Sequence, residues 1–242
     1  MRRTLLVTAA IGSLLAGAGA AQAAGLVPPD LMFGQPYVEF GGGFNFTSVT
    51  LTDLQTNAGC CDASVTSSTP LNIGSTIYGS IGTTVMPGLR VELQGSLRNN
   101  SGAHFNVSAE GGGAVGVDTK TFMLLGNVWK DFDVGNGLSF HVGGGLGFGS
   151  KTLTVTGATP TTQTVSGLAY LLGIGADYAL QKNMTLTFNY TVSNVTGTFG
   201  TSTIATGVDT SHSGPVDETV TGILGKGMDE SATVGLRFAL AP

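Results

Sequence analysis

Six charged side chains fall on the same phase of a two-residue alternation, and mutual ion pairing is the chemistry that their types and spacing offer. They are Glu39, Arg90, Glu92, Arg98, Asp177 and Arg237. The clearest stretch is residues 89–98, where leucine, valine and glycine alternate with arginine, glutamate, glutamine and serine. Charges enclosed in a narrow interior are costly unless they are paired and hydrogen-bonded. We therefore predict a ladder of arginine–carboxylate pairs that plugs the interior. A water-filled path lined by the same groups is the alternative, since charged rings also select ions.

Serine and histidine residues provide the candidates for catalysis and for haem binding. Ser139 and His141 lie two residues apart, so they share one face of a strand. A nucleophile and its base must also be oriented by a third group, and the sequence places no acidic partner beside them. We therefore predict that His141 is an interior polar residue and that the protein is not an enzyme. His104 and His212 fall in loop segments, and haem binding by such loops is a further alternative, although their spacing gives it no support.

Two further motifs carry no cofactor prediction. The glycine-rich run at residues 143–149 does not open into a helix, as a dinucleotide-binding fingerprint requires. The adjacent Cys60 and Cys61 lack the spacing and the histidine partners of a metal site. The sequence therefore predicts neither a cofactor nor a metal ion.

Eight segments with a two-residue alternation must position these side chains. They lie at residues 38–46, 73–81, 89–98, 121–128, 139–148, 168–178, 186–192 and 232–238. An alternation of this period places one set of residues on each face of a sheet. The connecting segments are alternately short and long, with tight turns at 86–88, 131–137 and 181–183 and long loops near 47–72, 99–119, 150–166 and 193–230.

Short turns at one end and long loops at the other are typical of an outer-membrane barrel. We predict an all-β fold, an eight-stranded antiparallel transmembrane β-barrel with short periplasmic turns and four long extracellular loops. A secreted β-sandwich is the alternative, but its wet face would need more charge than the 10% of charged residues in this chain. A net charge of −5 gives no basic surface for nucleic acid.

In lipid, the apolar set of each strand would face the acyl chains and the polar set would fill the lumen. Inward glycines, as in residues 143–147, would leave room for larger side chains opposite them. Five aromatic residues near strand ends are expected to form interfacial girdles, where aromatic rings concentrate. They are Tyr37, Phe46, Trp129, Tyr178 and Phe238.

The first residues have the layout of a cleaved secretory signal. Two arginines follow Met1, an apolar stretch runs from Leu5 to about Leu15, and small residues lead to an A-x-A site at Ala21 and Ala23. We predict a signal peptide at residues 1–23, a lead-in at 24–36 and a barrel domain at 37–242.

Three stretches resemble the opacity-like outer-membrane β-barrel surface proteins of alphaproteobacteria. They are residues 89–98, 124–132 and 232–238, which look like the third, fourth and closing strands of that family. Family members usually end on an aromatic residue that the assembly machinery recognises, whereas here four residues follow Phe238.

The resemblance implies an outer-membrane location and a structural surface protein with an antigenic or adhesive role. The expected partners are the lipid bilayer, lipopolysaccharide and, through the last strand, the barrel-assembly machinery, with host or phage surfaces as candidates for the loops. A small pore for ions or small solutes is the functional alternative.

Overall fold

The computed structural model describes residues 34–48, 50–56, 64–65, 71–108, 114–156, 161–197, 201–209, 216–225 and 228–240. The signal peptide predicted at residues 1–23, with its cleavage residues Ala21 and Ala23, lies outside them, as do Cys60 and Cys61. Within the described residues, no helix is long and apolar enough to cross a membrane.

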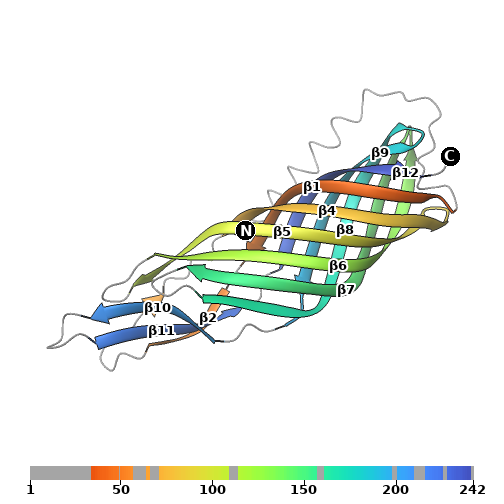
Figure 1. The fold of residues 1–242 in the computed structure, drawn as a ribbon. Helices are drawn as coiled ribbons and strands as arrows, with labels where there is room; N and C mark the ends of the chain where they lie inside the picture. The colour runs from red at the N-terminus through yellow and green to blue at the C-terminus, as the bar shows by residue number, and fades with distance from the viewer. Residues whose placement is uncertain are drawn as a thin grey trace.

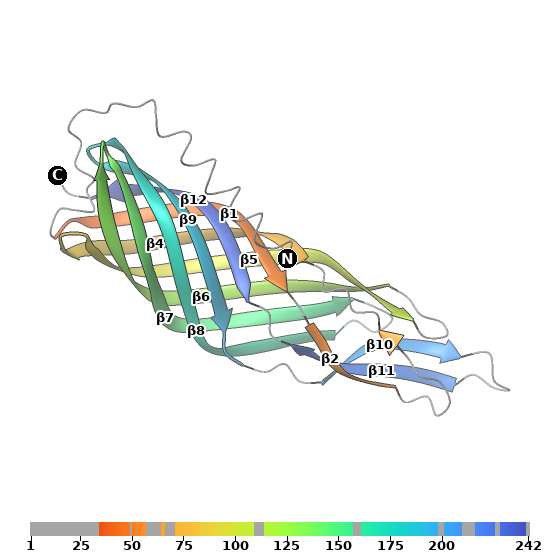
Figure 2. The same cartoon turned by 180° about the vertical axis from the view of Figure 1, so that it is seen from behind.

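Eight long strands form a closed antiparallel barrel (Figures 1 and 2). They are β1 (Pro36–Ser48), β4 (Leu71–Met86), β5 (Leu89–Ser108), β6 (Ala114–Gly135), β7 (Leu138–Thr156), β8 (Thr161–Gln181), β9 (Met184–Val195) and β12 (Asp229–Ala239). Each strand pairs with the next along this order, and β1 pairs with both β4 and β12, which closes the sheet. The predicted eight-stranded antiparallel barrel is therefore confirmed.

Tight turns gather at one end of the barrel, which we call the turn end. Pro87 and Gly88 join β4 to β5, and Lys182 and Asn183 join β8 to β9. Asn136 joins β6 to β7 and has a φ of 57°, a left-handed conformation that asparagine tolerates better than most residues. The start of β1 and the end of β12 lie at the same end, where the backbone N–H of Leu240 donates to the carbonyl of Pro36.

The opposite end, which we call the rim end, has walls of unequal height. Strands β5 to β8 each have 19 to 22 residues, whereas β1, β9 and β12 have 11 to 13. The tall strands run well beyond the short ones in Figure 1. A separate three-stranded sheet also lies at this end, formed by β2 (Thr50–Thr56), β10 (Thr201–Asp209) and β11 (Val216–Gly225), while β3 (Ser64–Val65) pairs with β5.

The prediction of long loops at 99–119 and 150–166 was wrong. Most of both segments continues as paired strand, leaving residues 109–113 and 157–160 as the connections. Alternating threonine with valine or leucine, as at residues 152–156, favours strand just as the apolar alternation does. The predicted turn at 131–137 is likewise shorter, because β6 runs to Gly135.

The two faces of the barrel wall differ as a membrane requires. Large apolar side chains are exposed on the outer face, including Phe40, Ile77, Leu124, Leu146 and Leu172. A polar and charged set is buried on the inner face. This distribution gives lipid an apolar surface and leaves backbone pairing inside the closed sheet.

The inner face also contains features that the alternation alone did not predict. Tyr37 and Trp129 are buried inside the barrel, so the expectation that they belong to an outer aromatic girdle was wrong. Both lie on the inward phase of their strands, which decides their direction more strongly than their position near a strand end. A buried apolar cluster also occupies part of the lumen. Its members are Met123, Leu125, Trp129, Ala169, Leu171 and Val195.

Candidate functional site

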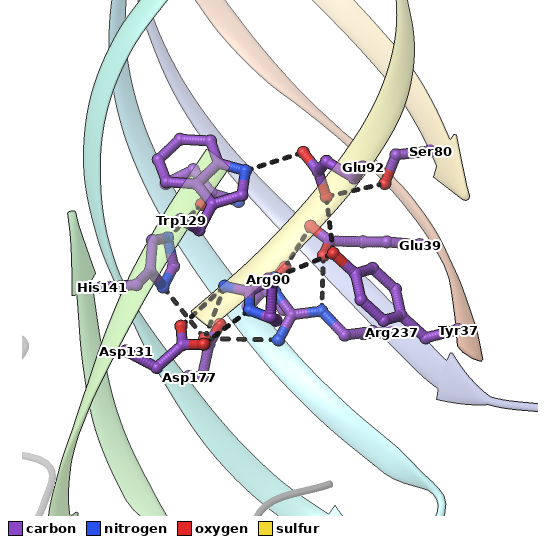
Figure 3. Close-up of polar contacts among 12 residues, drawn as sticks. Tyr37, Glu39, Ser80, Arg90, Glu92, Trp129, Asp131, His141, Asp177 and Arg237 are labelled. Carbon is purple, nitrogen blue, oxygen red and sulfur yellow. Dashed lines mark hydrogen bonds and ion pairs between the residues drawn. The ribbon is translucent and has the colours of Figure 1, made fainter. Parts of the chain in front are cut away.

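Side chains from all eight barrel strands meet inside the lumen near the turn end, and most of them are drawn in Figure 3. We call this group the turn-end network. Its members are Tyr37 and Glu39 from β1, Tyr78 and Ser80 from β4, Arg90 and Glu92 from β5, Asn127, Trp129 and Asp131 from β6, His141 from β7, Asp177 from β8, Thr187 and Asn189 from β9, and Arg237 from β12. The two-residue alternation puts each of them on the inward phase of its strand.

Arg90 forms the most complete ion pair of this network. Its Nε and Nη2 atoms each lie 2.8 Å from a different oxygen of Asp131, a bidentate arrangement. Nη2 also lies 3.6 Å from Asp177, and both carboxylates are fully buried. Because all three groups have left water, their mutual pairing is what makes their burial tolerable.

Arg237 joins the two ends of the chain across the barrel seam. Its Nε lies 2.8 Å from Oε2 of Glu39, and its Nη1 lies 3.4 Å from Asp177. Glu39 and Arg237 are directly opposite each other in the β1–β12 register. A one-residue slip of the closing strand would turn one of the two toward lipid, so this pair specifies the register of closure.

Glu92 is satisfied by neutral donors. Its two carboxylate oxygens accept hydrogen bonds from the hydroxyls of Tyr37 and Ser80, the amide of Asn127 and the indole Nε1 of Trp129, at 2.8 to 3.3 Å. Four neutral donors thus take the place of an arginine at this carboxylate. The predicted arginine–carboxylate ladder therefore differs at this position.

A chain of directed hydrogen bonds fixes the protonation state of His141. The Glu39 carboxylate accepts from the Tyr78 hydroxyl at 2.6 Å, so the Tyr78 oxygen accepts from the Asn189 amide at 3.1 Å. The amide oxygen of Asn189 is thereby turned to Nε2 of His141, at 2.7 Å, while Nδ1 lies 2.9 Å from Asp177. Both ring nitrogens face acceptors, which requires a doubly protonated imidazolium.

The turn-end network as a whole is slightly negative. Arg90, Arg237 and the His141 imidazolium face four carboxylates, those of Glu39, Glu92, Asp131 and Asp177. The Tyr37 ring adds a further contact to both guanidinium groups, which lie 5.7 and 5.1 Å from its centroid. These contacts place both guanidinium groups close to one aromatic ring.

Glycines on neighbouring strands make room for the rings. A Cβ atom at Gly173 would lie 2.9 Å from the Trp129 indole, and one at Gly41 would lie 2.5 Å from the Tyr78 ring. Residues other than glycine at these positions would therefore push the rings out of place. Trp129 in turn packs edge-on against His141, with ring centroids 5.2 Å apart.

A second and smaller group, the rim-end network, crosses the lumen farther from the turns. Its members are Asn45 and Thr47 of β1, Arg98 and Asn100 of β5, Lys151 of β7, Ser193 of β9, and Asp229 and Ser231 of β12. Asp229 lies 2.9 Å from the Lys151 ammonium and accepts from the Thr47 hydroxyl at 2.7 Å. Asn45 and Asn100 bond to each other through their amides, at 2.6 Å.

A polar cavity lies between the two networks. Glu39, Arg90, Glu92 and Arg237 line it at one end, and Arg98 lines it at the other. Between them the wall is formed largely by hydroxyl and amide side chains, which are those of Thr76, Tyr78, Gln94, Ser96, Asn189, Thr191, Ser231 and Thr233. The lumen is thus filled by side chains at two levels, with a hydrophilic space between those levels.

The structure distributes the six charged residues singled out in the sequence over the two networks. Glu39, Arg90, Asp177 and Arg237 are buried in the turn-end network, and Glu92 is half-buried there. Arg98 belongs to the rim-end network and is 3% exposed.

Sequence reasoning missed three other buried charged residues of the two networks, Asp131, Lys151 and Asp229. Asp131 and Lys151 were assigned to a turn and a loop, although the inward phase of their strands continues through both positions. Asp229 opens β12 on the inward phase, but it lies at the edge of a long polar segment that hides the start of the strand. Carrying the alternation through the polar residues would have found all three.

Among the residues that the structure describes, the interior offers neither a complete catalytic triad nor a free cation site. His141 has the acidic partner that the sequence did not place, Asp177, but its other nitrogen faces the Asn189 amide where a nucleophile would have to lie. Asp131, His141 and Asp177 each present a ligand atom within 4.8 Å of the others. The Arg90 guanidinium already lies against both of these carboxylates, so a positive charge holds that position.

The structure describes neither side chain of the two histidines considered for haem binding. His212 lies outside the described residues, and the described part of the structure gives the backbone of His104 in β5 but not its side chain. Haem binding by this pair therefore stays an untested alternative.

Comparison with known proteins agrees with this architecture. The model of a family described as the outer membrane protein beta-barrel domain matches residues 9–211. The crystal structure of OprG from Pseudomonas aeruginosa is 15% identical, covers 86% of this chain and 98% of its own, and superposes with a TM-score of 0.52. At this identity the likeness shows the fold alone.

Two further crystal structures are less similar. Neisserial surface protein A is 15% identical, over 85% of this chain and 97% of its own, with a TM-score of 0.49. The outer membrane protease OmpT from Escherichia coli is 10% identical, over 91% of this chain and 100% of its own, with a TM-score of 0.46. No curated protein matches the chain.

Proposed function

We propose, for a chain that belongs to the outer membrane protein beta-barrel domain family, a role as a closed barrel that anchors a surface region in the outer membrane. The observation that carries this proposal is the turn-end network, to which every barrel strand contributes a side chain. Buried ion pairs of this kind resist rearrangement, because removing either partner leaves a charge uncompensated. The interior therefore serves as a plug and a register lock.

The surface role is assigned to the rim end. The turn end would face the periplasm, as short turns do in outer-membrane barrels. The tall strands β5 to β8 and the sheet of β2, β10 and β11 would then project outside the cell, where rigid scaffolds commonly carry binding segments. Antigenic or adhesive contacts with host or phage surfaces, and contacts with lipopolysaccharide, belong to this proposal.

The finer assignments follow the resemblance seen in the sequence. We place the chain among the opacity-like surface barrels, with a mature form beginning after Ala23 and an alphaproteobacterial source. Its last strand, β12, would be recognised by the barrel-assembly machinery with Phe238 in place of a terminal aromatic. The proposal gives His141 a structural role and assigns no catalysis to the barrel.

Single-channel recording in a planar bilayer tests the plug. The folded wild-type protein should be electrically silent, because both polar networks cross the lumen. The double variant R90A/D131A removes a cation and its bidentate partner together, keeps the net charge unchanged, and should produce measurable openings. The matched control is Asp133→Asn, which removes an exposed carboxylate near the end of β6 and keeps an oxygen that can accept the hydrogen bond from the Gly135 N–H.

Folding of every variant is checked by circular dichroism and by the heat-dependent shift on a gel. Steady openings of the wild-type protein would reject the plug and favour the small pore. A folded R90A/D131A variant that stays electrically silent would show that Arg90 and Asp131 are not the groups that close the lumen. Antibodies against residues 198–227 should label intact cells, and a lack of labelling on cells that carry the folded protein would reverse the proposed orientation.

A further inference from the structure

We propose that the cavity between the two networks binds a small monovalent anion, of the halide class, at Arg98. The guanidinium of Arg98 is 3% exposed and lines this cavity. Its Nη1 donates to the Ser193 hydroxyl, while its Nε has no hydrogen-bond partner in the described part of the chain. No carboxylate of the described residues lies within ion-pair distance of it, in contrast to Arg90 and Arg237.

A second unpartnered donor faces the same space. The Ser96 hydroxyl is buried, lines the cavity and also lacks a partner among the described residues. Ser96 and Arg98 are successive inward positions of β5, so the two donors are neighbours on one wall. A buried cationic N–H and a buried O–H that lack acceptors both call for a ligand that is negatively charged and accepts hydrogen bonds.

The charge of the rim-end network supports an anion rather than a cation. Arg98 and Lys151 supply two positive charges, and Asp229 supplies one negative charge that already contacts the Lys151 ammonium at 2.9 Å. One buried positive charge is therefore left over, and a monovalent anion beside Arg98 would balance it. The cost of burying an unpaired charge is the physical reason for such a ligand.

The size and valence of the ligand follow from the other end of the cavity. Glu39 and Glu92 line that end together with Arg90 and Arg237. Both arginines are already paired with carboxylates, and the turn-end network has one carboxylate more than it has cations, so this end would not attract a multivalent anion or a large carboxylate. Arg98 is six residues farther along β5 than Glu92, which places it about 20 Å away along the strand. A compact ion close to Arg98 stays away from this end.

Bromide is the probe, because its anomalous scattering identifies it among waters. Crystals of the folded protein grown in sodium bromide should show an anomalous peak within hydrogen-bond distance of the Arg98 guanidinium. The peak should disappear in Arg98→Gln and persist in Arg98→Lys, which keeps the charge. The absence of a peak at Arg98 in wild-type crystals that show bromide at other sites would overturn the proposal.

A solution measurement separates specific binding from a general salt effect. At constant ionic strength, replacing gluconate by bromide should raise the unfolding midpoint of the wild-type protein along a curve that saturates. The exposed-lysine control Lys182→Gln should keep this curve, and Arg98→Gln should lose it. An equal and unsaturated rise in Arg98→Gln would refute the site.

Ser96→Ala covers the case in which Arg98→Gln does not fold. It removes one neutral donor and keeps the charge, so bromide should bind about three- to tenfold more weakly. Unchanged bromide affinity in Ser96→Ala would show that the ion lies elsewhere.

Discussion

Asp177 at the turn end and Asp229 at the rim end are both fully buried carboxylates on inward positions, yet their surroundings differ. One oxygen of Asp177 faces three cationic groups, those of Arg90, Arg237 and His141. Asp229 faces one cation, Lys151, and one hydroxyl, that of Thr47. The turn end is therefore a network in which three cations share one carboxylate, whereas the rim end holds a single ion pair among the described residues.

This difference matches the geometry of the wall. At the turn end all eight strands are present at one level, so each can supply a side chain to the same cluster. Toward the rim the strands end at different heights, and the rim-end network is formed by residues of five strands, β1, β5, β7, β9 and β12. Dense pairing thus occurs where all eight strands contribute, and the buried arginine without a described carboxylate at ion-pair distance, Arg98, occurs where five contribute.

The largest effect on the free energy of unfolding is expected when the two carboxylates are neutralised in turn, in Asp177→Asn and in Asp229→Asn. Asp177→Asn leaves three cations without their shared carboxylate, and we expect a loss of about 3–5 kcal/mol in the free energy of unfolding. Asp229→Asn deprives one cation of its partner and should cost less than Asp177→Asn. Urea unfolding in detergent, followed by the fluorescence of Trp129, measures both, because the chain has a single tryptophan.

Asp133→Asn, at an exposed position near the end of β6, serves as the control and should lie within about 0.5 kcal/mol of wild type. Equal losses in Asp177→Asn and Asp229→Asn would contradict the idea that the two ends are paired differently.

The strands and the direction of most side chains follow from the sequence, and the partners do not. The alternation at residues 89–98 fixes which residues point inward, since a strand has a period of two. It says nothing about which inward residues of other strands share a level, because that depends on the stagger of the sheet and on long-range register. Arg90 could therefore be placed in the lumen, whereas its pairing with Asp131 needed the structure.

Polar composition concealed other features. Lys151 and the threonines after it have a strand alternation without apolar residues, so a hydrophobicity-based interpretation assigned them to a loop. The direction of Trp129 was misjudged because aromatic residues near strand ends are common in girdles. In both cases the two-residue alternation of the strand predicted the direction of the side chain better than the residue type did.

A substitution beside the Trp129 ring tests how tightly side chains are packed at the turn end. Gly173→Ala brings a Cβ atom to within 2.9 Å of the Trp129 ring and 3.0 Å of Thr191. We expect a loss of about 1–3 kcal/mol in the free energy of unfolding from this overpacking. The matched control is Gly95→Ala on the outer face, where nothing lies within 4 Å of the new atom.

The emission spectrum of Trp129 gives an independent measurement, since displacement of the indole should alter its hydrogen bond to Glu92. If Gly173→Ala were as stable as Gly95→Ala and emitted like wild type, the ring would not be held by the space that Gly173 leaves.

The smallest expected effect is the loss of one hydroxyl donor to a buried carboxylate, which should depend on how many other donors that carboxylate keeps. Thr187 and Thr47 are both buried, and each donates its hydroxyl to a buried carboxylate, that of Glu39 and Asp229 respectively. In Thr187→Val, Glu39 keeps its bonds to Tyr78 and Arg237, so we expect a loss of about 0.5 kcal/mol. In Thr47→Val, the Lys151 ammonium is the remaining side-chain donor to Asp229 among the described residues. The loss should therefore approach the value typical of a hydrogen bond to a charged group, about 1.5–3 kcal/mol. Urea unfolding of the two variants beside wild type measures the difference. Since valine matches the shape of threonine in both, a larger loss for Thr187→Val would show that shared partners do not protect the turn end against removal of one donor.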